Sequence, residues 1–340
     1  MKKTKRITAL ILASLTLCAL LCACKGNNVP PPADTTKAPA ATTAPDTTAA
    51  PADTAAPDPS LGTAEELLRR FCLVLKDAPD ASIEKLANIF TLHPYLDGIE
   101  LYTSAGERTK YSDYNIIGLK SDFTIPEYSK FAAINAPMYG DKKIPFACSI
   151  FELNDGADAA AFAAALKENA DPASLGENIT GTECLAAAEG KYVFFVICPE
   201  DLKNSYDPAK PESITSVLNR LRIEAELYNT SVMAMDADDE SNFRFFGLKD
   251  SLALVEKGGA VAEPAVGGGF SVVLVRVKDK KDVSTVANEM AGGLDPGKWI
   301  CMCAETTQVE TNGNYVLGIM GSKDECQKIA DIFKALSLPE

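Results

Sequence analysis

The spacing of hydrophobic residues changes along the chain and divides it into three segments. Residues 7–23 are almost wholly apolar and follow four basic residues within positions 1–6. Residues 25–60 consist mainly of Pro, Ala, Thr and Asp, with no aromatic residue and one aliphatic residue larger than alanine. From residue 61 onward, apolar residues recur at the spacings of helices and strands. The pattern predicts an apolar leader, a segment that cannot form a core, and a folded part that begins near residue 61.

Two amphipathic helices are predicted at the start of the folded part. Thr63 to Glu66 has the spacing of a capping box, and the apolar residues from Leu67 to Leu75 recur at helical spacing. A second helix is predicted to begin at Ser82, a residue type that is favoured at N-caps. Residues 93–114 show no periodicity that predicts an element.

A series of motifs occurs twice in the folded part. Each series predicts two strands about a turn, a helix that begins at Asp, an Asp-Pro pair, a less regular strand, a Gly-x-Tyr-Val strand and a last helix. The paired motifs lie 123 to 129 residues apart, and this nearly constant separation indicates an internal duplication. The pairs are Gly118-Leu119-Lys120 with Gly247-Leu248-Lys249, Asp158 with Asp282, Asp171-Pro172 with Asp295-Pro296, and Gly190-Lys191-Tyr192 with Gly313-Asn314-Tyr315.

The duplication predicts an α+β fold made of two tandem ββαββα modules. Tight turns at Asp141 and Gly268 require hairpins, so each module is expected to hold a mainly antiparallel four-stranded sheet with helices on one face. The first module, with its N-terminal helices, is assigned to residues 61–210, and the second to residues 211–340.

The leader has the features of a secretory signal peptide, because a basic stretch precedes an apolar run that is short for a membrane span. The sequence Leu21-Cys22-Ala23-Cys24 resembles a lipobox, the processing signal of bacterial lipoproteins. This resemblance implies cleavage before Cys24 and attachment of diacylglycerol to its thiol. It departs from the usual pattern at Cys22, where Ser, Ala or Thr is common, and Cys22 stays open as an alternative. We therefore expect a signal peptide over residues 1–23, with plain secretion or an uncleaved anchor as competing interpretations.

Residues 24–60 are predicted to be a lipid-anchored, disordered Pro/Ala/Thr-rich linker. Their composition favours extended polyproline-like conformations, which rise about 3.1 Å per residue and give a reach on the order of 100 Å. The linker is expected to carry the folded part away from the outer face of the cell membrane.

Charge narrows the set of partners. The chain has 47 acidic and 33 basic residues, one His, and a net charge of −14. Removing residues 1–23, which contain four basic residues and no acidic ones, brings the net charge to −18. This charge argues against nucleic acid and anionic lipid headgroups. It favours a neutral or cationic ligand, or an envelope protein, as the partner.

The residues suited to catalysis do not combine into a complete catalytic set. Ser82 and Lys85 match the S-x-x-K nucleophile motif, but the chain lacks the Lys-Thr-Gly strand that accompanies it, and an N-cap explains Ser82. His93 is expected in a loop or partly packed. The acidic run at residues 236–240 lacks the spacing of a calcium-binding loop and is expected to be solvated. No cofactor is predicted.

Seven cysteines besides Cys24 follow the leader, and an odd number cannot all pair within the chain. We expect mostly buried free thiols that pack as small hydrophobes, with Cys301 in an apolar strand. One or more disulfides, or a weak metal site at Cys301-Met302-Cys303, stay open as alternatives. The seven residues are Cys72, Cys148, Cys184, Cys198, Cys301, Cys303 and Cys326.

The whole arrangement resembles the bacterial lipoprotein domain catalogued as domain of unknown function 4358, which is common in anaerobic Gram-positive bacteria of the Bacillota. The resemblance rests on the lipobox at Cys24, the Thr/Pro linker, the Gly-Leu step before a hairpin, and the Gly-x-Tyr-Val strand before the last helix. It covers residues 85–340 as two copies. It implies an envelope lipoprotein, and it transfers no functional residue to this chain.

These features predict a lipid-anchored cell-envelope protein with a non-catalytic binding or scaffolding role. The contact surface is expected on the duplicated sheet face or in the crevice between the copies. Two alternatives stay open. One is an envelope hydrolase of wall or peptide substrates, with Glu152 or Asp155 among its carboxylates. The other is a solute-binding lipoprotein.

Overall fold

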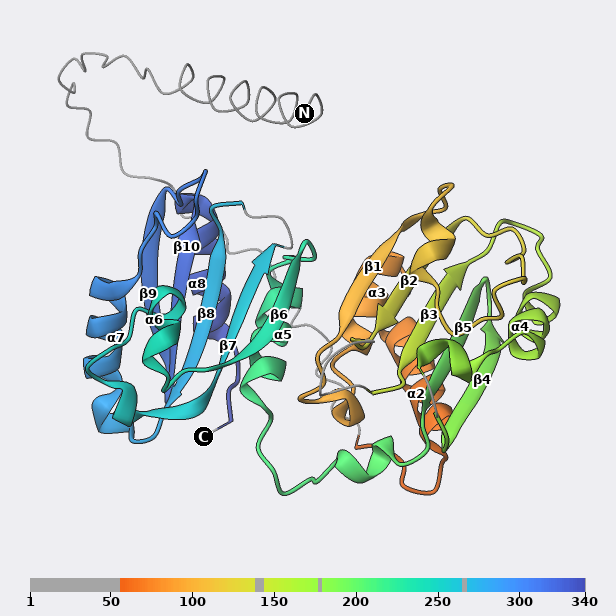
Figure 1. The fold of residues 1–340 in the computed structure, drawn as a ribbon, viewed down its shortest axis with the longest axis horizontal. Helices are drawn as coiled ribbons and strands as arrows, with labels where there is room; N and C mark the ends of the chain where they lie inside the picture. The colour runs from red at the N-terminus through yellow and green to blue at the C-terminus, as the bar shows by residue number, and fades with distance from the viewer. Residues whose placement is uncertain (1–55, 138–143, 177–178, 265–267, 340) are drawn as a thin grey trace, which may run out of the picture. The chain divides into compact units, whose positions relative to one another are not determined.

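The computed structural model describes residues 56–137, 144–176, 179–264 and 268–339 (Figure 1). The predicted signal peptide, Cys24, the predicted turn at Asp141 and most of the predicted linker lie outside the described residues. Within the described part of the chain, no helix combines the length and the apolar character that crossing a membrane requires.

The described residues form two five-stranded sheets in which neighbouring strands pair antiparallel. The first sheet has the order β1-β2-β3-β5-β4, and the second repeats it as β6-β7-β8-β10-β9. This architecture confirms the predicted α+β class with antiparallel sheets. The first sheet contains β1 (Tyr102–Glu107), β2 (Lys130–Asn135), β3 (Ala147–Glu152), β4 (Thr182–Glu189) and β5 (Tyr192–Pro199). The second contains β6 (Thr230–Asp236), β7 (Val255–Pro264), β8 (Ser271–Val277), β9 (Thr306–Asn312) and β10 (Tyr315–Gly321).

Each sheet has five strands, so the prediction of four was wrong. The additional strands are β1 and β6, which lie at the sheet edges beside β2 and β7. β1 reads Tyr-Thr-Ser-Ala-Gly-Glu, and none of its six residues is fully buried. Such a sequence lacks the alternation of apolar and polar residues that predicts a strand.

Seven α-helices accompany the strands in the described residues. They are α2 (Thr63–Asp77), α3 (Ile83–Phe90), α4 (Ala159–Glu168), α5 (Ile214–Glu224), α6 (Phe243–Phe246), α7 (Val283–Gly293) and α8 (Lys323–Ala335). α2 and α3 pack on one face of the first sheet, and α4 packs on the other. On the second sheet, α5 and α8 cover one face, while α6 and α7 cover the other (Figure 1).

The prediction of helices on one face was therefore also wrong. β5 buries Val193 and Phe195 on the side of α4, and it buries Phe194 and Val196 on the side of α2 and α3. A strand that is apolar on both faces needs cover on both faces. The one-face arrangement would require alternating polar residues, which the interior strand β5 does not have.

In each module one helix packs on the last two strands, but the two helices come from different places along the chain. α2 precedes the first sheet and packs on β4 and β5, whereas α8 follows the second sheet and packs on β9 and β10. The Thr63 hydroxyl donates a hydrogen bond to the carbonyl oxygen of Glu200 (2.7 Å), and the Ala64 amide donates to the side chain of Glu183 (2.7 Å). These bonds attach the start of α2 to β4 and to the end of β5. The helix that follows β5, α5, packs instead on the second sheet.

Most predicted helix starts are confirmed. Ser82 and Ser322 are the N-caps of α3 and α8, and each hydroxyl accepts a hydrogen bond from the amide three residues later. The predicted capping box at Thr63 was wrong by one residue, because the N-cap of α2 is Gly62 and the Thr63 hydroxyl is bonded to Glu200.

Gly190 and Gly313 explain the repeated Gly-x-Tyr motif. Each is the first residue of a two-residue hairpin turn, between β4 and β5 or between β9 and β10, and each has a φ of +58°. Glycine reaches positive φ without the steric cost that other residues incur. The tyrosines that follow, Tyr192 and Tyr315, are buried in the cores. Backbone geometry and packing therefore account for the repetition of this motif.

Candidate functional site

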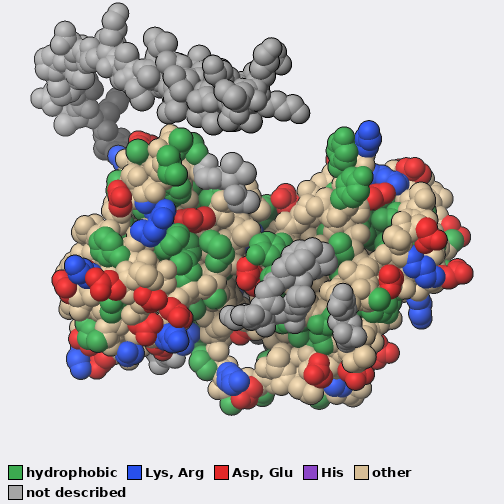
Figure 2. All heavy atoms as spheres, in the orientation of Figure 1, with side chains coloured by type: hydrophobic (Ala, Val, Ile, Leu, Met, Phe, Trp, Pro, Cys, Tyr) green, Lys and Arg blue, Asp and Glu red, His purple; other side chains and the backbone are tan. Residues whose placement is uncertain are grey.

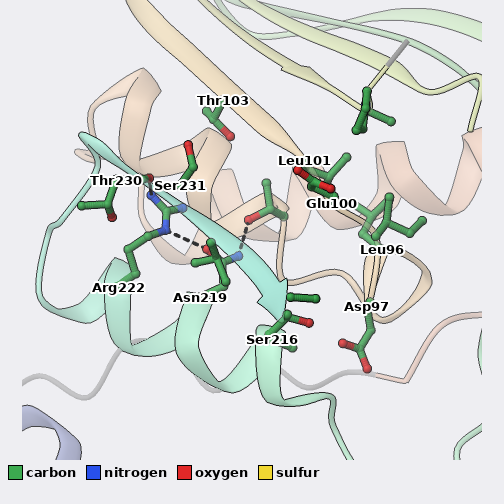
Figure 3. Close-up of a pocket in the computed structure, with 18 of the residues that line it drawn as sticks. Leu96, Asp97, Glu100, Leu101, Thr103, Ser216, Asn219, Arg222, Thr230 and Ser231 are labelled. Atoms are coloured by element: carbon green, nitrogen blue, oxygen red, sulfur yellow. Dashed lines mark hydrogen bonds between the residues drawn. The ribbon is translucent and has the colours of Figure 1, made fainter. Parts of the chain in front are cut away.

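A cavity of about 320 Å³ lies between α5, β6 and the chain segment that leads into β1 (Figure 3). Its walls include Asn219 and Arg222 of α5, Thr230 of β6, and the segment from Leu96 to Leu101. Elements of both modules line it, so it occupies the crevice between the copies. Its volume is at the lower end of the range for small-molecule sites.

α5 presents polar side chains to the cavity because its apolar residues are used in the core of the second module. Asn219 and Arg222 are one helical turn apart and therefore lie on the same side of the helix. Its N-cap, Ser213, donates hydrogen bonds to Asp97 from its amide (3.2 Å) and from its hydroxyl. The residues of α5 that pack on the second sheet are Val217, Leu218 and Leu221.

Arg222 is buried in the cavity wall, with 5% of its surface exposed. Its side chain donates hydrogen bonds to Oδ1 of Asn219 (2.8 Å), to the carbonyl oxygen of Thr230 (3.3 Å) and to Oδ1 of Asn88. All three acceptors are neutral. Burial lowers the pKa of Arg222 to about 10, because a low-dielectric environment disfavours the charged form. The guanidinium is still charged at neutral pH.

Hydrogen bonds join α3 to α5 behind this wall. The Asn219 amide donates to Oγ1 of Thr91 (2.9 Å), and the Thr91 hydroxyl donates to the carbonyl oxygen of Asn88 (2.6 Å). The side-chain amide of Asn88 donates in turn to the carbonyl oxygen of Glu84 (2.7 Å). Because these bonds form a connected network, the guanidinium of Arg222 is held in position without a ligand.

Tyr228 is among the residues that line the cavity, and its buried hydroxyl has no hydrogen-bond partner among the described residues. Burial raises the pKa of Tyr228 to about 12, so the hydroxyl keeps its proton and can donate. Buried hydroxyls in proteins are normally bonded. A residue that lines the cavity therefore has a buried donor with unused capacity.

Two carboxylates, Asp97 and Glu100, line the cavity on the side away from Arg222 in the view of Figure 3. Both side chains are exposed. Asp97 accepts its hydrogen bonds from Ser213, and Glu100 accepts one from the Tyr102 hydroxyl (2.5 Å). Neither has a basic side chain at ion-pair distance among the described residues.

This lining suits reversible binding by polar and charged groups. The described lining residues include hydroxyls, amides, one guanidinium and two carboxylates, but no His or Cys. The Ser216 hydroxyl donates to Glu212 (3.0 Å), yet that carboxylate is also ion-paired with Arg220 (2.9 Å). Burial raises the pKa of Glu212, with Arg220 acting in the opposite direction, but Glu212 is not among the residues that line the cavity. The geometry therefore supports a binding site better than a nucleophilic one.

The carboxylates of the predicted hydrolase do not meet at this cavity. Glu152 ends β3 and is ion-paired with Lys191 (2.6 Å) and with Lys130 (3.9 Å). Asp155 lies exposed in the turn before α4. Neither residue lines the cavity.

Ser82 and the acidic run at residues 236–240 have structural positions. Ser82 is an exposed N-cap that accepts the amide of Lys85 (3.2 Å). The four acidic residues of the run are exposed at the end of β6 and in the turn after it. Asp239 accepts the amide of Ser241 there (2.9 Å).

His93 is fully packed, with 1% of its surface exposed. Nδ1 accepts a hydrogen bond from the Tyr95 amide (3.0 Å), which assigns the ring proton to Nε2, and Nε2 lies 3.3 Å from Oε1 of Glu66. Burial lowers the pKa of His93, although Glu66 acts in the opposite direction. Glu66 also accepts two hydrogen bonds from Arg69 (both 2.7 Å). This group lies in the first core and serves its packing.

The seven cysteines after Cys24 are all free thiols. Cys301 and Cys303 are exposed in the irregular segment between α7 and β9, so the prediction of Cys301 in an apolar strand was wrong. A hydrogen bond from the Ala304 amide to the Pro296 carbonyl oxygen (2.8 Å) closes this segment into a loop, and β9 begins only at Thr306. The described residues contain no group of three or more side chains suited to holding a metal ion. The buried thiols are Cys148, Cys198 and Cys326.

A scan of the chain against protein-family models finds no match, and a search of curated proteins finds no similar sequence. The resemblance to the domain of unknown function 4358 family therefore stays a prediction.

The sequence analysis did not identify Arg222, Asn219, Asn88 or Tyr228. A signal for Arg222 was present, because it stands four residues after Leu218 and so falls on the apolar stripe of α5. Asn88 likewise interrupts the buried run of α3. A polar residue at an apolar position indicates a buried hydrogen-bond network, but the sequence does not show which residues share it.

Proposed function

We propose that this chain is a lipid-anchored, non-catalytic binding protein of the cell envelope, and that its ligand occupies the cavity between α5, β6 and the segment leading into β1. Cys24 is the proposed lipidation site, and the linker spaces the folded part from the outer face of the membrane. The basic leader, the apolar run and the lipobox-like Leu21 to Cys24 support the anchor.

The buried Arg222 is the observation that carries the binding role. A guanidinium held by neutral partners in the wall of a cavity can recognise a ligand without reorganising. The sheet faces offer less, because helices pack on both faces of each sheet. Acidic and basic side chains are interspersed over the face of the molecule in Figure 2. The crevice is therefore the better of the two contact surfaces that the sequence suggested.

Ligand-induced stabilisation tests the binding role. The full chain is screened by thermal unfolding against amino acids, peptides, sugars and polyamines. A ligand present at 100 times its Kd adds about 2.7 kcal/mol to stability, which raises Tm by a few degrees. Ala234→Trp places a large side chain at an exposed cavity position of β6 and should abolish the shift. Asp236→Trp lies two residues along the same strand, outside the cavity lining, and should keep it.

A stabilising compound whose effect is the same in both variants would contradict binding at this cavity. The anchor is tested separately. Cys24→Ala should abolish incorporation of labelled palmitate and release the protein from membranes, and retained label would refute the assignment.

A further inference from the structure

Arg222 carries a charge that has no direct ion-pair partner among the described residues. No Asp or Glu of the described residues lies at ion-pair distance from its guanidinium. By contrast, Arg69, Arg220 and Arg276 have carboxylate oxygens at 2.7, 2.9 and 3.6 Å. A buried charge normally has a partner of opposite sign, because desolvation without one is costly. Glu84 favours the charged form of Arg222 from beyond ion-pair distance, and an anion in the cavity would add a direct partner.

The donors on this side of the cavity are also only partly used. A guanidinium has five N–H donors, and Arg222 makes three hydrogen bonds. The buried hydroxyl of Tyr228, another residue that lines the cavity, makes none. A carboxylate supplies two oxygens with several lone pairs and can accept from both residues.

The far side of the cavity carries negative charge that has no basic ion-pair partner among the described residues. Asp97 and Glu100 accept hydrogen bonds from Ser213 and Tyr102, but no basic side chain neutralises them among the described residues. Figure 3 places these carboxylates across the view from Arg222. An ammonium group fits that side, whereas a phosphate or sulfate would bring two charges to a cavity with one cation.

We infer that the cavity binds a small zwitterion, an amino acid or a short peptide, with its carboxylate on Arg222 and Tyr228 and its ammonium group toward Asp97 and Glu100. This inference rests on the proposed function and specifies its ligand class. The volume of about 320 Å³ admits such a molecule.

Isothermal titration calorimetry of the full chain tests the inference with the twenty free amino acids and a set of dipeptides. The tightest binder is then compared with its C-terminal carboxamide and with its N-acetyl form. Each blocked form should bind about 10- to 100-fold more weakly, because each loses a charge-assisted contact. The carboxamide tests the Arg222 side, and the N-acetyl form tests the acidic side. Comparing the affinities of free amino acids with those of dipeptides distinguishes the two sources of this ligand chemistry.

Variants locate the carboxylate. Tyr228→Phe removes a hydroxyl that has no partner in the free protein, so folding should be retained while the acid binds several-fold more weakly. Tyr315→Phe is the matched control, because it removes another buried tyrosine hydroxyl outside the cavity lining, and affinity should not change. Arg222→Gln should abolish the preference for the acid over the carboxamide. If that variant does not fold, Tyr228→Phe still decides the question.

The outcomes separate this inference from the function on which it rests. Equal affinity for acid and carboxamide would overturn the zwitterion while leaving a binding protein. The same conclusion would follow if no compound of the panel bound while another compound gave a thermal shift that Ala234→Trp abolished. If no binding depends on the cavity, the inference and the proposed function both fail.

Discussion

Replacement of Glu66 by Gln is the sharpest test of how the first module is held together. The Glu66 carboxylate is 0% exposed, and it accepts hydrogen bonds from Arg69, from His93 and from the Asp58 amide (3.2 Å). Burial alone would raise the pKa of Glu66, but the hydrogen bonds from His93 and Arg69 lower it from 4.5 to about 2. Gln keeps the size of the side chain and removes its charge.

The expected loss follows from the linkage between pKa and stability. A pKa lowered from 4.5 to about 2 on folding corresponds to about 3 kcal/mol. Because the folded state has the lower pKa, this stabilisation is fully present above pH 4.5 and is lost as the pH falls toward 2. Glu66→Gln should therefore be about 3 kcal/mol less stable than the wild type at neutral pH, and the two should converge near pH 2.

Urea unfolding followed by circular dichroism between pH 2 and 7 measures this difference. Glu65→Gln is the matched control, because Glu65 is the exposed neighbour on the same helix and its side chain accepts only the Gly62 amide (3.3 Å). That change should cost well under 1 kcal/mol. The reasoning would be refuted if Glu66→Gln were no less stable than Glu65→Gln, or if its deficit stayed constant across the pH range.

Three further outcomes are expected. Because the pKa of His93 is lowered by folding, the unfolded chain takes up a proton before the folded protein does as the pH falls through 6.5. Stability measured by urea unfolding should therefore decline in this pH range. His93→Gln should flatten that part of the pH profile. Gly313→Ala should lower stability by about 1 kcal/mol and lower Tm, because the residue has a φ of +58°. The cost comes from the backbone alone, since nothing lies within 4 Å of an added Cβ. An unchanged Tm would argue against the turn geometry. Peptide mapping after brief iodoacetamide treatment of the native protein should find Cys301 and Cys303 alkylated and Cys198 protected, whereas a protected Cys301 would contradict the exposed loop.

The duplication was predictable because it depends on local signals that recur at a fixed separation. A hairpin glycine before a buried tyrosine, or an Asp that begins a helix, acts over a few residues, and the structure has these at Gly190 and Asp158. The edge strand β1 was missed because it has almost no apolar residues. The helices on the second face of each sheet were missed although β5 signals them, since an unbroken apolar strand requires cover on both sides.

The site was less predictable because it depends on contacts between distant parts of the chain. Arg222 and Asn88 are 134 residues apart, and neither belongs to a recognisable motif. Their polar character within apolar stripes signals a buried partner without naming it. The guanidinium of the cavity comes from α5 and its two carboxylates come from the segment around Asp97, and only the fold brings them together.

The attachment of α2 determines where mechanical force enters the protein. A pull transmitted through the residues before position 56 reaches the start of α2, where Thr63 and Ala64 are bonded to Glu200 and Glu183. Glu183 belongs to β4 and Glu200 follows β5, so such a pull would act first on these two paired strands. α8, the counterpart of α2, packs on β9 and β10 of the second sheet. A pull on the N-terminal side of α2 would therefore act on the first module before it reached the second.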